Sequence, residues 1–179
     1  RGPSVAIAHR QELVTQISTA LARNSVRHRI IGPPSVVRLC SQVHCAEVGA
    51  SWVDPSAMCA VAGVDTLVRR GDALRQWAES CTLWVQDEAH HLLPDNKWGK
   101  AIATFPNARG LGVTATPERA DGRGLDGVFQ RLVSGPTMRE LIRQGYLTEY
   151  RIFAPRTSDL NLAAIDVSKA TGDYNPVQL

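Results

Sequence analysis

The chain has 179 residues and a formal net charge of +3, with 44% hydrophobic and 21% charged residues. This composition is typical of a soluble globular protein, and the length suffices for one α/β domain with a short extension. No apolar run approaches the roughly 20 residues that a membrane-spanning helix needs, so we expect no membrane partner. The mild charge does not by itself argue for nucleic acid. The chain begins with Arg1 and shows no signal peptide, which predicts a processing boundary there and a cytoplasmic location.

The four cysteines leave two alternatives open. Cys40, His44 and Cys45 are a candidate zinc cluster, although structural zinc sites usually carry paired C-x-x-C knuckles. Cys59 and Cys81 lie in or beside apolar runs, where a free cysteine is commonly buried. Reduced thiols in a cytosolic protein are therefore the default expectation.

Along the chain, short apolar runs alternate with helical patterns, which is typical of a parallel α/β sheet. The expected strands are residues 5–9, 29–31, 59–64, 82–86 and 111–114. Apolar residues at three- and four-residue spacing predict helices around residues 13–21 and 36–43, and further helices are expected at 73–79, 98–104 and 138–143. Gly145 then follows as a helix stop signal.

The sequence changes character near residue 150. Residues 150–154 favour one more strand, which Pro155 interrupts, and polar and small residues dominate from Thr157 onward. We therefore expect a domain over residues 1–150 and a linker over residues 151–179.

Two adjacent acids, Asp87 and Glu88, follow the apolar run of the expected strand 82–86. Ligands of open α/β sheets bind at the carboxyl ends of the strands. A nucleotide-driven motor needs two acids there, one to hold magnesium and one to orient the attacking water. We expect Asp87 to hold magnesium through a water molecule and Glu88 to polarise the attacking water. His90 lies within reach of the same edge. The alternative is a solvated acidic turn.

Thr114, Ala115 and Thr116 lie at the end of the last expected strand and precede a proline. Their hydroxyls are expected to hydrogen-bond to the acidic motif, and Ala115 leaves room between the strands. The alternative is that these are ordinary strand threonines.

Two segments are candidate nucleic-acid contacts. His9 and Arg10 lie where a strand passes into a helix, and a helix N-terminus with an added arginine is suited to phosphate. Thr66 begins a basic turn after the strand 59–64, although its neighbour Asp65 would disfavour phosphate unless it points away. An ordinary helix start and an ordinary turn are the alternatives.

Two other segments partly match the sequence patterns of phosphate-binding loops but lack the required context. Residues 122–127 match G-x-G-x-x-G, but no strand precedes them and no clear helix follows. Gly99 and Lys100 lie inside a helical pattern, and Ala101 replaces the hydroxyl residue of a Walker A loop. No G-x-x-x-x-G-K-[ST] occurs in the printed sequence.

Together, the DEAH letters 87–90, the TAT letters 114–116 and the segment around His9 resemble the first RecA-like domain of a superfamily 2 DEAH/DEAD-box DNA helicase. The restriction-subunit and repair-helicase branch is the most similar. The resemblance implies a RecA-like P-loop NTPase fold, an α/β parallel sheet flanked by helices, here an incomplete first motor domain without its Walker A segment. It also implies ATP and magnesium as cofactors.

The resemblance further implies DNA as partner and a second RecA-like domain of the same protein. Asp87, Glu88 and His90 would form the catalytic group, Thr114, Ala115 and Thr116 would couple hydrolysis to movement, and His9, Arg10 and Thr66 would contact nucleic acid. We expect the intact protein to be a helicase or translocase, and the residues of this sequence alone to be inactive. The alternatives are a non-catalytic RecA-like module that binds DNA or protein, and the motor subunit of a restriction enzyme.

Overall fold

A computed structural model describes residues 2–117, 124–151 and 153. Contacts within the chain divide it into two compact units, Arg1–Phe129 and Gln130–Leu179. The first unit carries every residue to which the sequence assigns chemistry. The predicted boundary near residue 150 stays a prediction.

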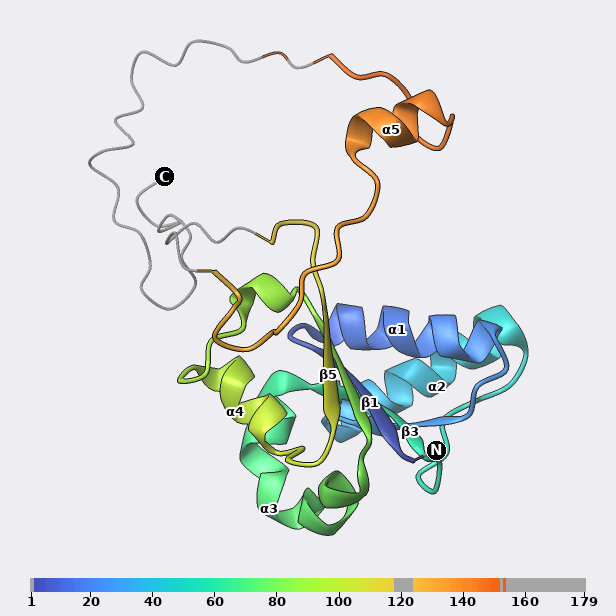
Figure 1. The fold of residues 1–179 in the computed structure, drawn as a ribbon. Helices are drawn as coiled ribbons and strands as arrows, with labels where there is room; N and C mark the ends of the chain where they lie inside the picture. The colour runs from blue at the N-terminus through green and yellow to red at the C-terminus, as the bar shows by residue number, and fades with distance from the viewer. Residues whose placement is uncertain (1, 118–123, 152, 154–179) are drawn as a thin grey trace, which may run out of the picture. The chain divides into compact units, whose positions relative to one another are not determined.

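The first unit is built on a five-stranded sheet in which every neighbouring pair is parallel, with the order β2-β3-β1-β4-β5 (Figure 1). The strands are β1 Ser4–Ala8, β2 His28–Ile31, β3 Cys59–Gly63, β4 Leu83–Asp87 and β5 Arg109–Val113. The predicted α/β class and all five predicted strands are confirmed, with shifts of one or two residues. Parallel strands need crossover connections, and the helices supply them.

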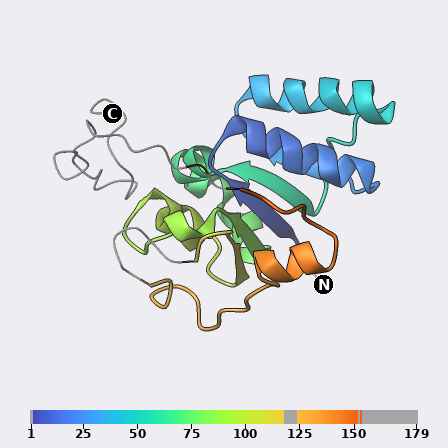
Figure 2. The same cartoon turned by 90° about the horizontal axis from the view of Figure 1, so that it is seen from above.

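Helices cover both faces of the sheet (Figure 2). Helices α1 Gln11–Arg23 and α2 Pro34–Val48 pack on one face, where Val14 and Val36 join Ala8 and Val61 in a buried cluster. Helices α3 Val64–Ser80 and α4 Lys97–Ala103 pack on the other, in a second buried cluster. This second cluster contains Trp84, Trp98 and Phe105.

Helix α3 corrects the sequence prediction. It begins at Val64, directly after β3, and not near residue 73 as expected. Residues 64–67 are therefore the first turn of a helix and not a loop turn. The physical reason is burial, since Val64 and Leu67 are fully buried against the sheet and hold the chain helical from its first residue.

In the second unit, helix α5 Met138–Arg143 forms as predicted and begins with a capping box between Thr137 and Glu140. Gly145 has φ of 77°, which agrees with its role as a helix stop. The expected strand 150–154 is not present at Tyr150, Arg151 or Phe153, since these residues have no regular structure. The remainder of that segment and of the expected linker lies outside the described residues.

Within the described part of the chain, no helix is long and apolar enough to cross a membrane.

Candidate active site and nucleic-acid interface

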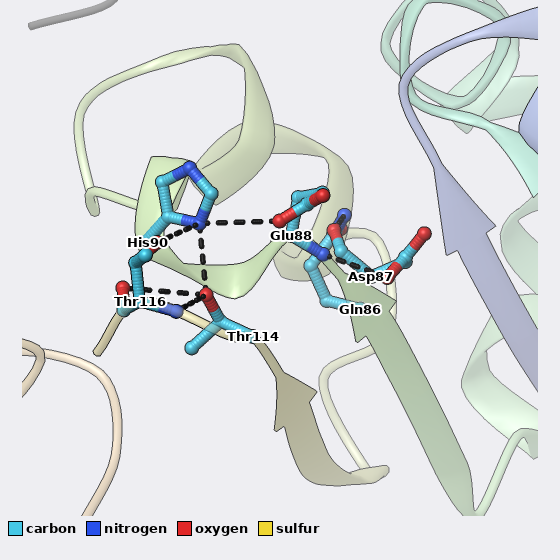
Figure 3. Close-up of polar contacts among 6 residues, drawn as sticks. All are labelled: Gln86, Asp87, Glu88, His90, Thr114 and Thr116. Carbon is cyan, nitrogen blue, oxygen red and sulfur yellow. Dashed lines mark hydrogen bonds and ion pairs between the residues drawn. The ribbon is translucent and has the colours of Figure 1, made fainter. Parts of the chain in front are cut away.

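The acidic pair lies at the carboxyl end of β4, a central strand of the sheet. Asp87 is the last residue of β4, and Glu88 precedes a short 3-10 helix, η1 Ala89–His91. Asp87 Oδ1 accepts a hydrogen bond from the backbone N–H of Glu88 at 3.0 Å. Glu88 has φ of 53° and ψ of 49°, a left-handed conformation that non-glycine residues rarely adopt. The two carboxyl groups consequently point in different directions, with Glu88 turned towards His90 (Figure 3).

The carboxylate of Asp87 has no basic ion-pair partner in the described part of the chain: in residues 2–117, 124–151 and 153, no lysine or arginine forms an ion pair with it. Magnesium in nucleotide sites is commonly held by one or two carboxylates together with waters and substrate phosphates. The partly exposed carboxylate of Asp87, at the strand edge where ligands bind, fits this ion.

His90 connects the acidic pair to the end of β5. Its Nδ1 lies 2.9 Å from Thr114 Oγ1, 3.3 Å from Glu88 Oε2 and 3.4 Å from Thr116 Oγ1. The backbone N–H of Thr116 donates to Thr114 Oγ1 at 3.1 Å. The expected bonding between the threonines and the acidic motif is therefore present, and His90 mediates it (Figure 3). Ala115 lies between the two threonines, after β5 has ended at Val113.

Gln86 belongs to the site although the sequence did not single it out. It is fully buried, and its Nε2 donates to the carbonyl of Asp87 at 2.7 Å and to that of Ile7 at 3.3 Å. This side chain ties the last peptide of β4 to β1. Its Oε1 is buried and has no hydrogen-bond partner among the described residues. The sequence feature that could have identified Gln86 is a glutamine inside an otherwise apolar strand.

A pocket opens where β1, β2 and β3 end and the helices α1, α2 and α3 begin. Its lining includes the N-cap residues of all three helices, Arg10, Pro33 and Gly63. At none of these three positions does the side chain of the cap residue accept a hydrogen bond from the first turn of its helix. Three helix N-termini thus direct backbone N–H groups and positive dipole ends towards one place, which favours an anion.

Thr66 and two arginines complete the pocket. Thr66 is only 5% exposed, lines the pocket, and its hydroxyl has no hydrogen-bond partner in the described part of the chain. Arg10 and Arg69 also line it. The predicted contacts Arg10 and Thr66 are therefore brought together, although 56 positions separate them in the printed sequence.

Asp65 has its charge compensated. Its Oδ1 lies 3.2 Å from Nζ of Lys97, at the start of α4. The repulsion between this carboxylate and a phosphate is therefore reduced, and no local sequence pattern pairs Asp65 with Lys97.

His9 lines the same pocket and lies partly buried between it and η1. Burial, followed by the charge of Arg10, lowers the pKa of His9, whereas Glu88 and Asp87 raise it. His9 therefore experiences charges from both the pocket and the acidic pair.

The candidate zinc residues have other surroundings. His44 Nε2 lies 3.0 Å from Ser18 Oγ in a buried network, Cys40 is buried and Cys45 is exposed. Among the described residues, no group of three or more His, Cys, Asp or Glu side chains is placed to hold a metal ion. Gly99 and Lys100 lie within α4, as predicted.

Comparison with known proteins agrees with this geometry. The family model described as "Type III restriction enzyme, res subunit" matches residues 3–119. A curated relative, the "51.5 kDa protein" of a Lactococcus phage (isolate 7-9), is 31% identical over 97 residues, which are 52% of this chain and 20% of the relative. The match thus spans about a fifth of that relative's length.

The fold and the matched family define a RecA-like α/β domain of the helicase-like motor class. The chain belongs to the family of type III restriction enzyme res subunits.

Proposed function

We propose that this chain is the nucleotide-hydrolysing part of an ATP-dependent DNA helicase or translocase. The observation that carries the proposal is the acidic pair at the end of β4 with a separate anion pocket on the same edge of the sheet. One site would act on the nucleotide and the other would hold the nucleic-acid backbone.

Asp87 would hold magnesium through water, and Glu88 would orient and deprotonate the water that attacks the γ-phosphate. Bound magnesium supplies neutralisation of the charge that develops on the phosphates. His90 would keep Glu88 in place, and Thr114 and Thr116 would transmit the state of the site to β5. Because the printed residues include no Walker A lysine, we expect these residues alone to give no measurable turnover.

Arg10 and Thr66 would bind a backbone phosphate of the DNA, with His9 beside them. Contacts to a backbone phosphate would position the DNA and would carry no sequence information. The family favours the motor subunit of a restriction enzyme as the biological setting.

The test uses the full-length protein and its Glu88→Gln variant. We expect DNA-stimulated ATP hydrolysis in the wild type and a loss of about 10² to 10⁴-fold in the variant, with nucleotide binding retained. Glu79→Gln, which changes an exposed glutamate at the far end of α3, is the matched control. A wild-type protein that binds DNA without hydrolysing ATP would instead establish a non-catalytic module.

A further inference from the structure

The start of α4 contacts both functional sites. Asn96 caps the helix, with its Oδ1 accepting the backbone N–H groups of Trp98 at 2.9 Å and Gly99 at 3.1 Å. The Nδ2 of the same Asn96 donates to the carbonyl of His91, in η1, at 2.7 Å. Residues 96–98 are therefore fixed to the segment that immediately follows the acidic pair.

The same turn reaches the wall of the anion pocket. Lys97 forms the ion pair with Asp65, and its Nζ also lies 4.7 Å from the centre of the Trp98 ring. The ring of Trp98 lies 6.4 Å from that of His9, which lines the pocket. Two contacts thus join the start of α4 to the pocket, one ionic and one aromatic.

Packed rings connect Trp98 to the acidic pair. Its ring centre is 5.3 Å from that of His91, and the His91 ring is 4.0 Å from that of His90. His90 in turn contacts Glu88 and Thr114. A displacement of Trp98 would therefore reach the group that holds Glu88.

Two polar atoms in this cluster are poorly satisfied. Trp98 Nε1 and His9 Nδ1 are both buried without a hydrogen-bond partner among the described residues. Buried polar atoms are nearly always paired in native proteins, so a rearrangement that gives these two atoms partners would be favourable. A ligand that binds such a rearranged cluster more tightly would shift the population towards it.

We propose that the first turn of α4, residues 96–98 with Trp98 at its centre, is a positioning element that couples occupancy of the anion pocket to the arrangement of the acidic pair. The proposal rests on the function proposed above. Its consequence is reciprocal: nucleotide changes the affinity for DNA, and DNA changes the affinity for nucleotide by the same factor.

The test measures this linkage factor in the full-length protein. The dissociation constant of a labelled oligodeoxynucleotide is measured with and without magnesium and a non-hydrolysable ATP analogue. The dissociation constant of the nucleotide is then measured with and without the oligonucleotide. Trp98→Phe shortens the aromatic bridge, and Asn96→Ser keeps a helix cap but removes the bond to His91. Trp77→Phe is the matched control, because the indole N–H of Trp77 is likewise buried without a partner among the described residues, whereas its ring packs on Phe105.

We expect a wild-type linkage factor of about fivefold or more, falling to within about twofold of unity in Trp98→Phe and Asn96→Ser and unchanged in Trp77→Phe. Thermal unfolding of each variant shows that the change is not a loss of folding. Retention of the wild-type factor in both variants would overturn the proposal, as would a wild type that binds both ligands without linkage. A wild type that binds neither probe would overturn the proposed function itself.

Discussion

His90 Nδ1 and Thr114 Oγ1 lie 2.9 Å apart, so that the segment after β4 is tied to the segment after β5. The two residues are 24 positions apart in the chain and come from neighbouring parallel strands. The contact makes the geometry of Glu88 depend on the end of β5.

A double-mutant cycle measures that dependence. His90→Ala, Thr114→Val and the double variant are compared for DNA-stimulated ATP hydrolysis in the full-length protein. We expect a coupling energy of about 0.5–3 kcal/mol, because the two groups are in direct contact. Strictly additive effects would show that the hydrogen bond has no part in turnover. Thr104→Val, which removes a hydroxyl that donates to the carbonyl of Lys100 in α4, serves as the control.

The anion pocket predicts a salt-dependent effect on nucleic-acid binding. Arg10→Ala should weaken binding to DNA of any sequence and reduce the slope of log affinity against log salt by about one unit. Arg38→Ala removes the same charge from an exposed position of α2 and should leave the slope unchanged. Equal slopes in the wild type and Arg10→Ala would remove Arg10 from the interface.

Thr66→Val tests the unpaired hydroxyl in the same pocket. We expect DNA affinity to fall by roughly 1 kcal/mol with little change in salt dependence, because a neutral hydrogen bond is lost. Titration of labelled DNA at fixed salt measures both quantities. An unaltered affinity would mean that Thr66 does not touch phosphate.

A buried network far from the acidic pair predicts pH-dependent stability. Ser18 Oγ lies 2.7 Å from His28 Nε2 and 3.0 Å from His44 Nε2, and both rings are fully buried. His28 Nδ1 lies 2.8 Å from the carbonyl of Val26, and the backbone N–H of Trp52 donates to His44 Nδ1 at 3.3 Å. These contacts define one neutral arrangement, in which His28 carries its proton on Nδ1 and His44 on Nε2.

Burial lowers the pKa of both histidines. For His44, the charge of Glu47 acts in the opposite direction. The unfolded chain therefore takes up protons near pH 6.5, before the folded chain does. The contribution of these histidines to the free energy of unfolding should be fully present above this pH. At lower pH the free energy of unfolding should decrease by up to about 1.4 kcal/mol per pH unit for each histidine. Urea unfolding between about pH 5 and pH 8 measures the slope. His44→Gln should flatten it, and a slope equal to that of the wild type would contradict the assignment.

The sequence predicts much of the sheet and little of what surrounds the site. Apolar runs that end in Asp87 or before Thr114 locate strand ends, since buried parallel strands read as continuous apolar segments. The early start of α3 was missed because Gly63 and Asp65 resemble turn residues, although Val64, Leu67 and Leu74 follow a helical spacing.

Contacts between distant segments could not be predicted from local patterns. The anion pocket depends on the strand order, which places β3 beside β1. The pairing of Asp65 with Lys97 and the stacking of Trp98 near His9 depend on how α4 packs over the sheet. The spacing of apolar residues within one segment carries no information about contacts between distant segments.

The left-handed backbone of Glu88 has a thermodynamic consequence. A non-glycine residue in this conformation costs roughly 1–2 kcal/mol, which the rest of the fold must offset. Glu88→Gly should therefore make the protein harder to unfold than Glu88→Gln does, by about 1 kcal/mol, even though both remove the carboxylate. Equal stability of the two variants in urea would argue against strain. If the difference is found, the position to which we assign activation of the attacking water is also one at which the wild-type residue opposes folding, so selection for stability alone would replace it.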